Sequence, residues 1–337
     1  MASGLLVAVS VGLIAIGFLV LNQGAKLLTD NALGLAGRIG RSRFVIGALL
    51  VSTLSALPEV LVSGIALQEG SPEIALGNAL ASNVVTLAFV IGLSALIVPI
   101  RSTREIVLRD AVFFATVTVV SAALLLDGTL SSLDGLALVA LFVPYTVNLL
   151  IAQKKVQPAE LDAAVQDMKI ELEMTGWLFG RKVEVRAGLP WLTFGVIWAV
   201  MGAQFIVIGA VQLSGASGVS EWILGITVVA LGSSLPDIAA AYHATRKGYT
   251  DLALGEGLGA CVVTALLTLG IMGMLKPTTY EASLIIPAIA VTIATSFLLL
   301  AFMLGGWKVS RRAGGVLIAA YFAMVALNLV MFTGRAQ

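Results

Sequence analysis

The stretch "STLSALPEVLVS", residues 52–63, places a proline and an acid inside an apolar run that covers residues 44–67. Pro58 has no amide proton, so a helix through this run leaves the carbonyl of Leu54 without its partner. Glu59 adds a charge, which costs about 2.5–3.5 kcal/mol at the centre of a membrane helix. Together the two residues predict a broken helix beside a cavity, because unpaired backbone at membrane depth is tolerated where it lines protein or water.

The composition indicates that the run does lie in a membrane. Of the 337 residues, 59% are hydrophobic and 12% charged, whereas soluble domains contain about 25% charged residues. The mean hydropathy is +1.02. The net charge of +1 argues against nucleic-acid binding, and the single cysteine, Cys261, cannot form an internal disulfide. The amino-terminal apolar run lacks the basic leader and cleavage pattern of a removable signal, so we expect it to be the first spanning helix.

Apolar runs long enough to cross a bilayer, about 20 residues each, divide the chain into ten predicted spans. They lie near residues 4–24, 44–67, 74–98, 106–126, 132–152, 188–212, 221–244, 252–274, 281–303 and 313–334. With the amino terminus outside, 17 of the 20 Lys and Arg residues fall in cytoplasmic segments, and the opposite loops hold mostly acids. We therefore predict that both termini lie outside and that the polar linker, residues 153–187, is cytoplasmic and contains a short amphipathic helix.

The two halves of the chain repeat each other with an offset of 178 residues. This shift places Leu57-Pro58-Glu59 on Leu235-Pro236-Asp237, and "ALGNAL" (75–80) on "ALGEGL" (253–258). Because five spans is an odd number, the second copy enters the membrane from the opposite side. Inverted repeats of this kind are typical of secondary transporters, whose sites lie near the midplane.

The predicted fold is therefore an all-α integral membrane protein with ten transmembrane helices, arranged as two inverted five-helix repeats with broken helices 2 and 7. The first repeat covers residues 1–152 with its signature region at 44–98. The second covers residues 188–337 with its signature region at 222–274, and the linker 153–187 joins them.

An inverted repeat would bring Glu59 and Asp237 together near the pseudo-twofold axis. Two facing carboxylates repel each other unless they share a proton or a cation. Hydroxyls accompany both acids, since Ser52 and Ser55 lie on the helical face of Glu59, and Ser233 precedes Asp237 by one turn. Hard divalent cations prefer such oxygen ligands, so these residues predict a cation site.

A second polar stripe follows each break. In the first half Asn78, Ser82 and Thr86 are spaced by one helical turn. The corresponding residues of the second half are Glu256, Ala260 and Thr264. The stripe extends the predicted oxygen-lined cavity.

These residues resemble the signatures of the calcium/cation antiporter superfamily, which includes the sodium/calcium exchangers. Those signatures are a G-T/S-S-x-P-E helix break and a following helix with G-N-x-x-G-S-N-x-x-N/D. Here they stand as "LSALPE" with "GNALASNVVT" and as "GSSLPD" with "GEGLGACVVT". The resemblance implies a secondary antiporter that works by alternating access.

The resemblance also implies roles for particular residues. The divalent-ion ligands would be the central acids Glu59 and Asp237, the hydroxyls of Ser55 and Ser233, and the backbone carbonyls of Ser52 and Ala230. Positions for the coupling ion, or in its cavity, would be Asn78, Ser82, Thr86, Glu256, Thr264 and Ser234.

The sequence departs from the family pattern mainly at the sodium positions. Ala56 and Ala260 stand where the family has hydroxyls, and Thr86 and Thr264 stand where it has an amide or an acid. Glu256 replaces an asparagine and adds a third acid. These departures leave both Na⁺ and H⁺ open as the coupling ion, since a proton needs only a buried carboxylate.

We predict a secondary active antiporter that exchanges a divalent cation, Ca²⁺ before others, for Na⁺ by alternating access. The first alternative is H⁺-coupled divalent exchange with a contribution from Glu256. A further alternative is a non-transporting or lipid-handling membrane protein on the same fold. We expect no enzymatic activity, no cofactor, no nucleic acid and no obligate protein partner, with membrane lipids and inorganic cations as the partners.

Overall fold

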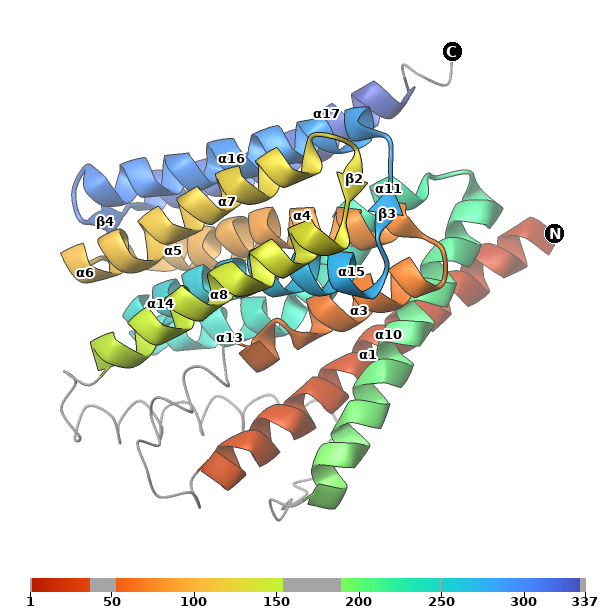
Figure 1. The fold of residues 1–337 in the computed structure, drawn as a ribbon, viewed down its shortest axis with the longest axis horizontal. Coiled ribbons are helices and arrows are strands. Elements are labelled where there is room, and N and C mark those ends of the chain that lie inside the picture. The colour runs from red at the N-terminus through yellow and green to blue at the C-terminus, as the bar shows by residue number, and fades with distance from the viewer. Residues whose placement is uncertain (1, 37–52, 154–188, 249, 334–337) are drawn as a thin grey trace.

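The structure, a computed structural model, describes residues 2–36, 53–153, 189–248 and 250–333 (Figure 1). Ser52 and nearly all of the predicted linker 153–187 lie outside the described residues. Apart from four strands of two residues each, every described element is helical.

The first half comprises eleven described elements. They are α1 (Ala2–Ala36), α3 (Leu57–Gln68), α4 (Pro72–Val85), η1 (Thr86–Gly92), α5 (Leu93–Ile97), β1 (Ile100–Arg101), α6 (Arg104–Ile106), η2 (Val107–Ala111), α7 (Val112–Leu125), β2 (Thr129–Leu130) and α8 (Ser132–Gln153). The elements named η are π-helical segments that continue the neighbouring α-helices.

The second half comprises twelve. They are α10 (Leu189–Ser217), α11 (Glu221–Leu224), η4 (Gly225–Val229), α12 (Ala230–Ser233), α13 (Leu235–Arg246), α14 (Thr250–Val263), η5 (Thr264–Thr268), α15 (Leu269–Leu275), β3 (Thr278–Thr279), α16 (Ala282–Leu304), β4 (Lys308–Val309) and α17 (Arg311–Thr333).

The helices are those of a multi-pass membrane protein. Within the described residues seven helices are long and apolar enough to cross a bilayer, and the bent pair 221–233 and 235–246 raises this number to eight. Two shorter apolar helices, Leu57–Gln68 and Ser132–Asn148, overlap the other two predicted spans. The structure is therefore an all-helical membrane protein, as the sequence predicts.

Helix α1 is longer than its predicted span of residues 4–24. It continues to Ala36, so its 35 residues extend about 52 Å against about 30 Å of hydrocarbon. Residues 25–36 include seven alanines and leucines, all strong helix formers, and no proline. Apolar run length therefore marks the membrane-embedded part of α1 and not the end of the helix.

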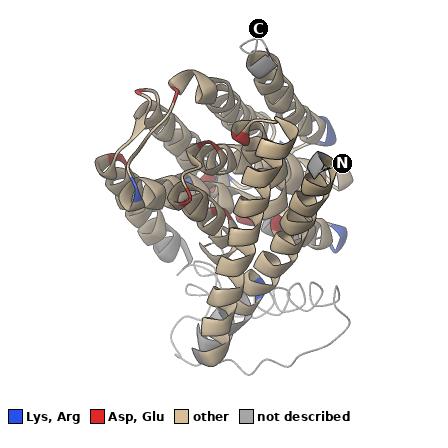
Figure 2. Cartoon of the chain, turned by 90° about the vertical axis from the view of Figure 1, so that its right-hand side faces the viewer, with Lys and Arg blue, Asp and Glu red and all other residues tan. Residues whose placement is uncertain are grey.

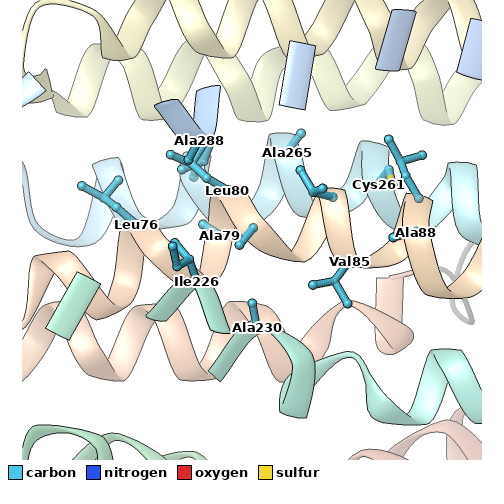
Figure 3. Close-up of a cluster of buried hydrophobic side chains, with 14 of the residues drawn as sticks. Leu76, Ala79, Leu80, Val85, Ala88, Ile226, Ala230, Cys261, Ala265 and Ala288 are labelled. Carbon is cyan, nitrogen blue, oxygen red and sulfur yellow. The ribbon is translucent and has the colours of Figure 1, made fainter. Parts of the chain in front are cut away.

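Two spans form the centre of the molecule. In the spans 72–97 and 253–275, 78% of the most apolar window is buried, against 22% for α1. Figure 3 shows α4 crossing this core, with Ile226 and Ala230 on one side and Cys261 and Ala265 on the other. Small side chains let these helices approach closely, as the glycine-rich sequence suggests.

Helices α1 and α10 lie side by side along one flank (Figure 1). Their contact is lined by glycine: a Cβ added at Gly17 would lie 2.9 Å from the carbonyl oxygen of Gly202, and one at Gly24 would lie 2.8 Å from that of Gly195. The backbones therefore touch. From the first pair to the second, the residue number increases along α1 and decreases along α10, so the two helices are antiparallel.

Corresponding elements of the two halves begin 178 residues apart. This holds for α3 and α13, α4 and α14, and β1 and β3. The four short strands form two antiparallel sheets, β1 with β4 and β2 with β3, at opposite ends of the molecule (Figure 1). Each sheet therefore joins one strand from each half.

The two ends of the molecule differ in charge. Strands β1 and β4 carry Arg101 and Lys308, whereas Asp127 and Glu281 flank β2 and β3. Figure 2 views the β2–β3 end and shows Asp and Glu on several of its helices and loops. The start of α1 and the end of α17 lie at this same end (Figure 1).

Candidate cation site

The first break lies in the stretch at residues 52–63. Residues 53–55 are helical, Ala56 forms a turn, and α3 begins at Leu57 with Pro58 in its first turn. Glu59 follows in the same turn and is only 2% exposed. A proline suits this position because its missing amide proton is not needed there, and the helix amino terminus favours an acid.

The second break repeats this geometry. Helix α12 ends at Ser233, Ser234 leaves helical geometry with φ −89° and ψ 0°, and α13 begins at Leu235. The helices on either side of the break are bent by 45°. Asp237 lies in the first turn of α13 and is buried, as Glu59 is in α3.

The second break contacts the acid of the first. The Ser234 hydroxyl donates to Oε1 of Glu59 at 3.0 Å. The Ser233 hydroxyl lies 3.1 Å from Oδ1 of Asn78 and 3.3 Å from the carbonyl oxygen of Ala230. Residues from both halves therefore meet in one buried polar cluster.

Asn78 of α4 connects this cluster. Its amide nitrogen Nδ2 donates to the backbone carbonyl of Glu59 at 3.3 Å, and its Oδ1 lies 3.4 Å from the Ser82 hydroxyl. The structure thus brings together half of the twelve predicted site residues. These six are Glu59, Asn78, Ser82, Ala230, Ser233 and Ser234.

Four other predicted residues are buried or half-buried in the broken helices or in the helices that follow them. Thr86 and Thr264 are buried and each begins a π-helical segment, a distortion that is frequent at functional sites. Ser55 lies immediately before the first break and is half-buried, and Glu256 is half-buried in α14. Ser52 lies outside the described residues.

Two residues of the site were not among those predicted from the sequence. Ser63 is fully buried and accepts from Nδ2 of Asn78 at 2.9 Å. Ser63 lies four residues after Glu59, on the same face of the helix, and this spacing could have indicated that it belongs to the site. Phe18 of α1 packs its ring against Gly232, where an added Cβ would overlap it, and an apolar residue in an apolar helix carries no such signal.

One carboxylate oxygen of this cluster has no protein partner. Oε2 of Glu59 is buried, and the described residues offer it no hydrogen bond. A buried acceptor left unpaired costs about 1–3 kcal/mol, and more when charged. No three His, Cys, Asp or Glu side chains converge within the described ranges, so a cation held here would take its other oxygens from hydroxyl, amide or backbone groups.

The fold and these paired breaks are features of an ion transporter. A model of the family described as "Sodium/calcium exchanger protein" matches residues 9–151 and 188–330. The chain belongs to this family. The resemblance seen in the two signatures is therefore confirmed.

Similar proteins cover nearly the whole chain. The inner membrane protein YrbG of Escherichia coli is 28% identical over 317 residues, which cover 92% of this chain and 93% of YrbG. The sodium/calcium exchanger MaX1 of Methanosarcina acetivorans is 24% identical over 356 residues, covering 96% and 99%. A solved structure of the sodium-calcium exchanger NCX_Mj, soaked with Na⁺ and Sr²⁺, matches with a TM-score of 0.63 and 25% identity, covering 95% of this chain and 98% of that chain.

Proposed function

We propose that this protein is a secondary active antiporter that exchanges a divalent cation, Ca²⁺, for Na⁺ by alternating access. The observation that carries the proposal is the contact of Ser234 with Glu59, which joins the two breaks while Oε2 of Glu59 has no hydrogen-bond partner among the described residues. The names of MaX1 and NCX_Mj support calcium and sodium as the ions.

The proposed architecture is ten transmembrane helices in two inverted five-helix repeats, with helices 2 and 7 broken. The constant offset of elements supports it, and so do the glycine contacts. A Cβ added at Gly92 would lie 3.0 Å from the carbonyl oxygen of Gly314, and one at Gly270 would lie 3.1 Å from that of Gly135. The two pairs correspond under the same offset to within one residue.

The proposed orientation has both termini outside and the linker 153–187 in the cytoplasm. The basic strands β1 and β4 would then face the cytoplasm, and the acidic β2–β3 end would face outward. This arrangement follows the rule that Lys and Arg collect on the cytoplasmic side.

In the proposed mechanism the divalent ion binds between Glu59 and Asp237. Its charge offsets both carboxylates, and the hydroxyls of Ser55 and Ser233 and the carbonyls of Ser52 and Ala230 complete its shell. The coupling ion would use the same cavity, which is lined by Asn78, Ser82, Thr86, Ser234, Glu256 and Thr264. Exchange follows because a second cation can enter only when the first has released the acids.

The test is Ca²⁺ uptake into vesicles that contain the purified protein and carry either a sodium gradient or a pH gradient. Sodium-driven uptake supports the proposal. Uptake driven by the pH gradient alone would make the proton the coupling ion. A protein that moves no divalent ion under either gradient, and that Ca²⁺ does not stabilise against heat, would not be an exchanger.

A further inference from the structure

Asn78 has more polar neighbours in the cluster than any other side chain for which contacts are described. It is fully buried in α4, and four polar groups surround its amide. Nδ2 faces the backbone carbonyl of Glu59 at 3.3 Å and the hydroxyl of Ser63 at 2.9 Å. Oδ1 faces the hydroxyls of Ser82 at 3.4 Å and Ser233 at 3.1 Å.

The chemistry of these neighbours fixes the orientation of the amide. A backbone carbonyl can only accept, so the nitrogen and not the oxygen of Asn78 must face Glu59. The oxygen then faces Ser82 and Ser233, whose hydroxyls can donate to it. An asparagine has two donor hydrogens and two acceptor lone pairs, and four polar groups within 3.4 Å can pair with them here.

We propose that Asn78 is a positioning residue that joins the two breaks, and that it is not a ligand of the transported ion. This inference rests on the proposed exchange function for its effect on transport. A cation at Oδ1 would have to displace the Ser82 or Ser233 hydroxyl, whereas Oε2 of Glu59 receives no hydrogen bond from the residues that the structure describes.

The bonds of Asn78 run to both halves of the chain. One reaches α3 immediately after the first break, through Glu59, and another reaches α12 immediately before the second, through Ser233. If either break moves alone, the amide loses a partner at a fully buried position. The two breaks therefore shift together.

Asn78 has no equivalent amide in the second half. The residue 178 positions later is Glu256. An ionised carboxylate has no hydrogen to donate, so it cannot hold a backbone carbonyl as Asn78 does. Asn78 is therefore the one amide that joins the breaks among the described residues, beside the direct bond from Ser234 to Glu59.

Hydrogen–deuterium exchange tests the connection without reference to transport. The variant Asn78→Ala, in lipid nanodiscs, should exchange faster than wild type at both breaks, residues 53–60 and 230–238. The matched control is Asn328→Ala, which removes another buried asparagine that accepts from Trp222 Nε1 at 2.9 Å and donates to the Met324 carbonyl at 2.8 Å. The control should leave both breaks unchanged, and faster exchange at only one break, or at neither, in Asn78→Ala would overturn the proposal.

A milder variant keeps the test decisive if Asn78→Ala does not fold. Ser63→Ala removes only the 2.9 Å bond to Asn78 and leaves every proposed ion ligand in place. It should speed exchange at both breaks in the same direction. Unchanged exchange at the second break in this variant would equally count against the connection.

Transport separates positioning from ligation. Asn78→Ala should raise the apparent KM for Ca²⁺ about tenfold, equal to about 1.4 kcal/mol, with a smaller change in maximal rate. Ser63→Ala should raise KM by less, and the double variant should resemble Asn78→Ala, because both act through one network. Additive effects on KM would identify Asn78 as a ligand. A wild-type protein that moves no Ca²⁺ would refute the proposed function. The hydrogen–deuterium exchange measurement would then decide the role of Asn78.

Discussion

The Ser234 hydroxyl donates to the Glu59 carboxylate at 3.0 Å across a sequence separation of 175 residues. The bond links the turn of one broken helix to the acid of the other. It also occupies Oε1, so that Oε2 remains for another partner. The position corresponding to Ser234 in the first half is Ala56, which has no side-chain hydroxyl.

Replacing Ser234 with alanine should weaken cation binding. The variant leaves a second oxygen of Glu59 unpaired, which costs about 1–3 kcal/mol. We expect the apparent KM for Ca²⁺ uptake to rise about three- to tenfold. Ser296→Ala is the control, because this buried serine bonds only to the carbonyl of Ile293 in its own helix. Equal KM values for Ser234→Ala and wild type would show that the bond does not support the site.

Neutralising both acids should abolish transport without unfolding the protein. Glu59→Gln with Asp237→Asn removes the two charges that would hold a divalent ion, and it also removes the cost of burying them. Uptake should disappear and Ca²⁺ should no longer raise the melting temperature, although a wild-type site gains about 2.7 kcal/mol at a concentration of 100 Kd. Without Ca²⁺ the double variant should be at least as stable as wild type. Persistent Ca²⁺ uptake would place the site elsewhere.

A methyl group at Gly232 should interfere with helix α1. An added Cβ there would overlap the ring of Phe18, so Gly232→Ala forces one of the two to move. Overpacking of this kind costs about 1–3 kcal/mol, measured as a lower melting temperature. Adding Phe18→Ala should recover part of the loss. Gly12→Ala, on α1 with nothing within 4 Å of its added Cβ, should be neutral, and an equally neutral Gly232→Ala would contradict this packing.

The Tyr280 phenol should stabilise the β2–β3 end in a pH-dependent way. Its Oη donates to the Leu125 carbonyl at 2.8 Å and lies 3.1 Å from that of Thr129. Burial is the main cause that raises the pKa of Tyr280, and the nearby negative charges of Asp127 and Asp134 raise it further. Tyr280→Phe should therefore cost about 0.5–1.5 kcal/mol at neutral pH.

The sign of the pH effect follows from that raised pKa. Above about pH 10 the phenol of the unfolded chain loses its proton, whereas the folded protein keeps it because its pKa is raised. Deprotonation therefore stabilises the unfolded chain, and the contribution of Tyr280 to the free energy of unfolding falls as the pH rises. The difference in unfolding free energy between wild type and Tyr280→Phe should shrink between about pH 9 and about pH 11. Tyr242→Phe, whose hydroxyl accepts from exposed Arg246, is the control. A difference that stays constant over this range would mean that the buried bond is absent.

The sequence predicted those features that depend on local chemistry. Pro58 and Pro236 marked the breaks because proline cannot complete a helical bond, and the structure begins a new helix at Leu57 and at Leu235. The acids were predicted to be buried because each follows a proline in an apolar run, and both are. The offset of 178 residues anticipated the matching starts of α3 and α13.

Features that depend on packing between distant helices could not be predicted in this way. Phe18 contacts Gly232 only because α1 lies against the second break, and neither residue differs from ordinary apolar sequence. The bonds of Asn78 to Ser63 and Ser233 require polar side-chain atoms from three helices to meet at about 3 Å. The stripe of Asn78, Ser82 and Thr86 indicated a polar face but not which hydrogen bonds its members form.

The two small sheets have a consequence for how such a molecule can move. Because β1 pairs with β4 at one end of the molecule and β2 with β3 at the other, strand pairing joins the two halves at both ends. If the two halves opened about the middle of the molecule, the hydrogen bonds of one of these strand pairs would have to break. In the described part of the chain, α1 and α10 contribute no strand to either sheet. If the protein works by alternating access, we therefore expect this pair of helices to move while both sheets stay paired.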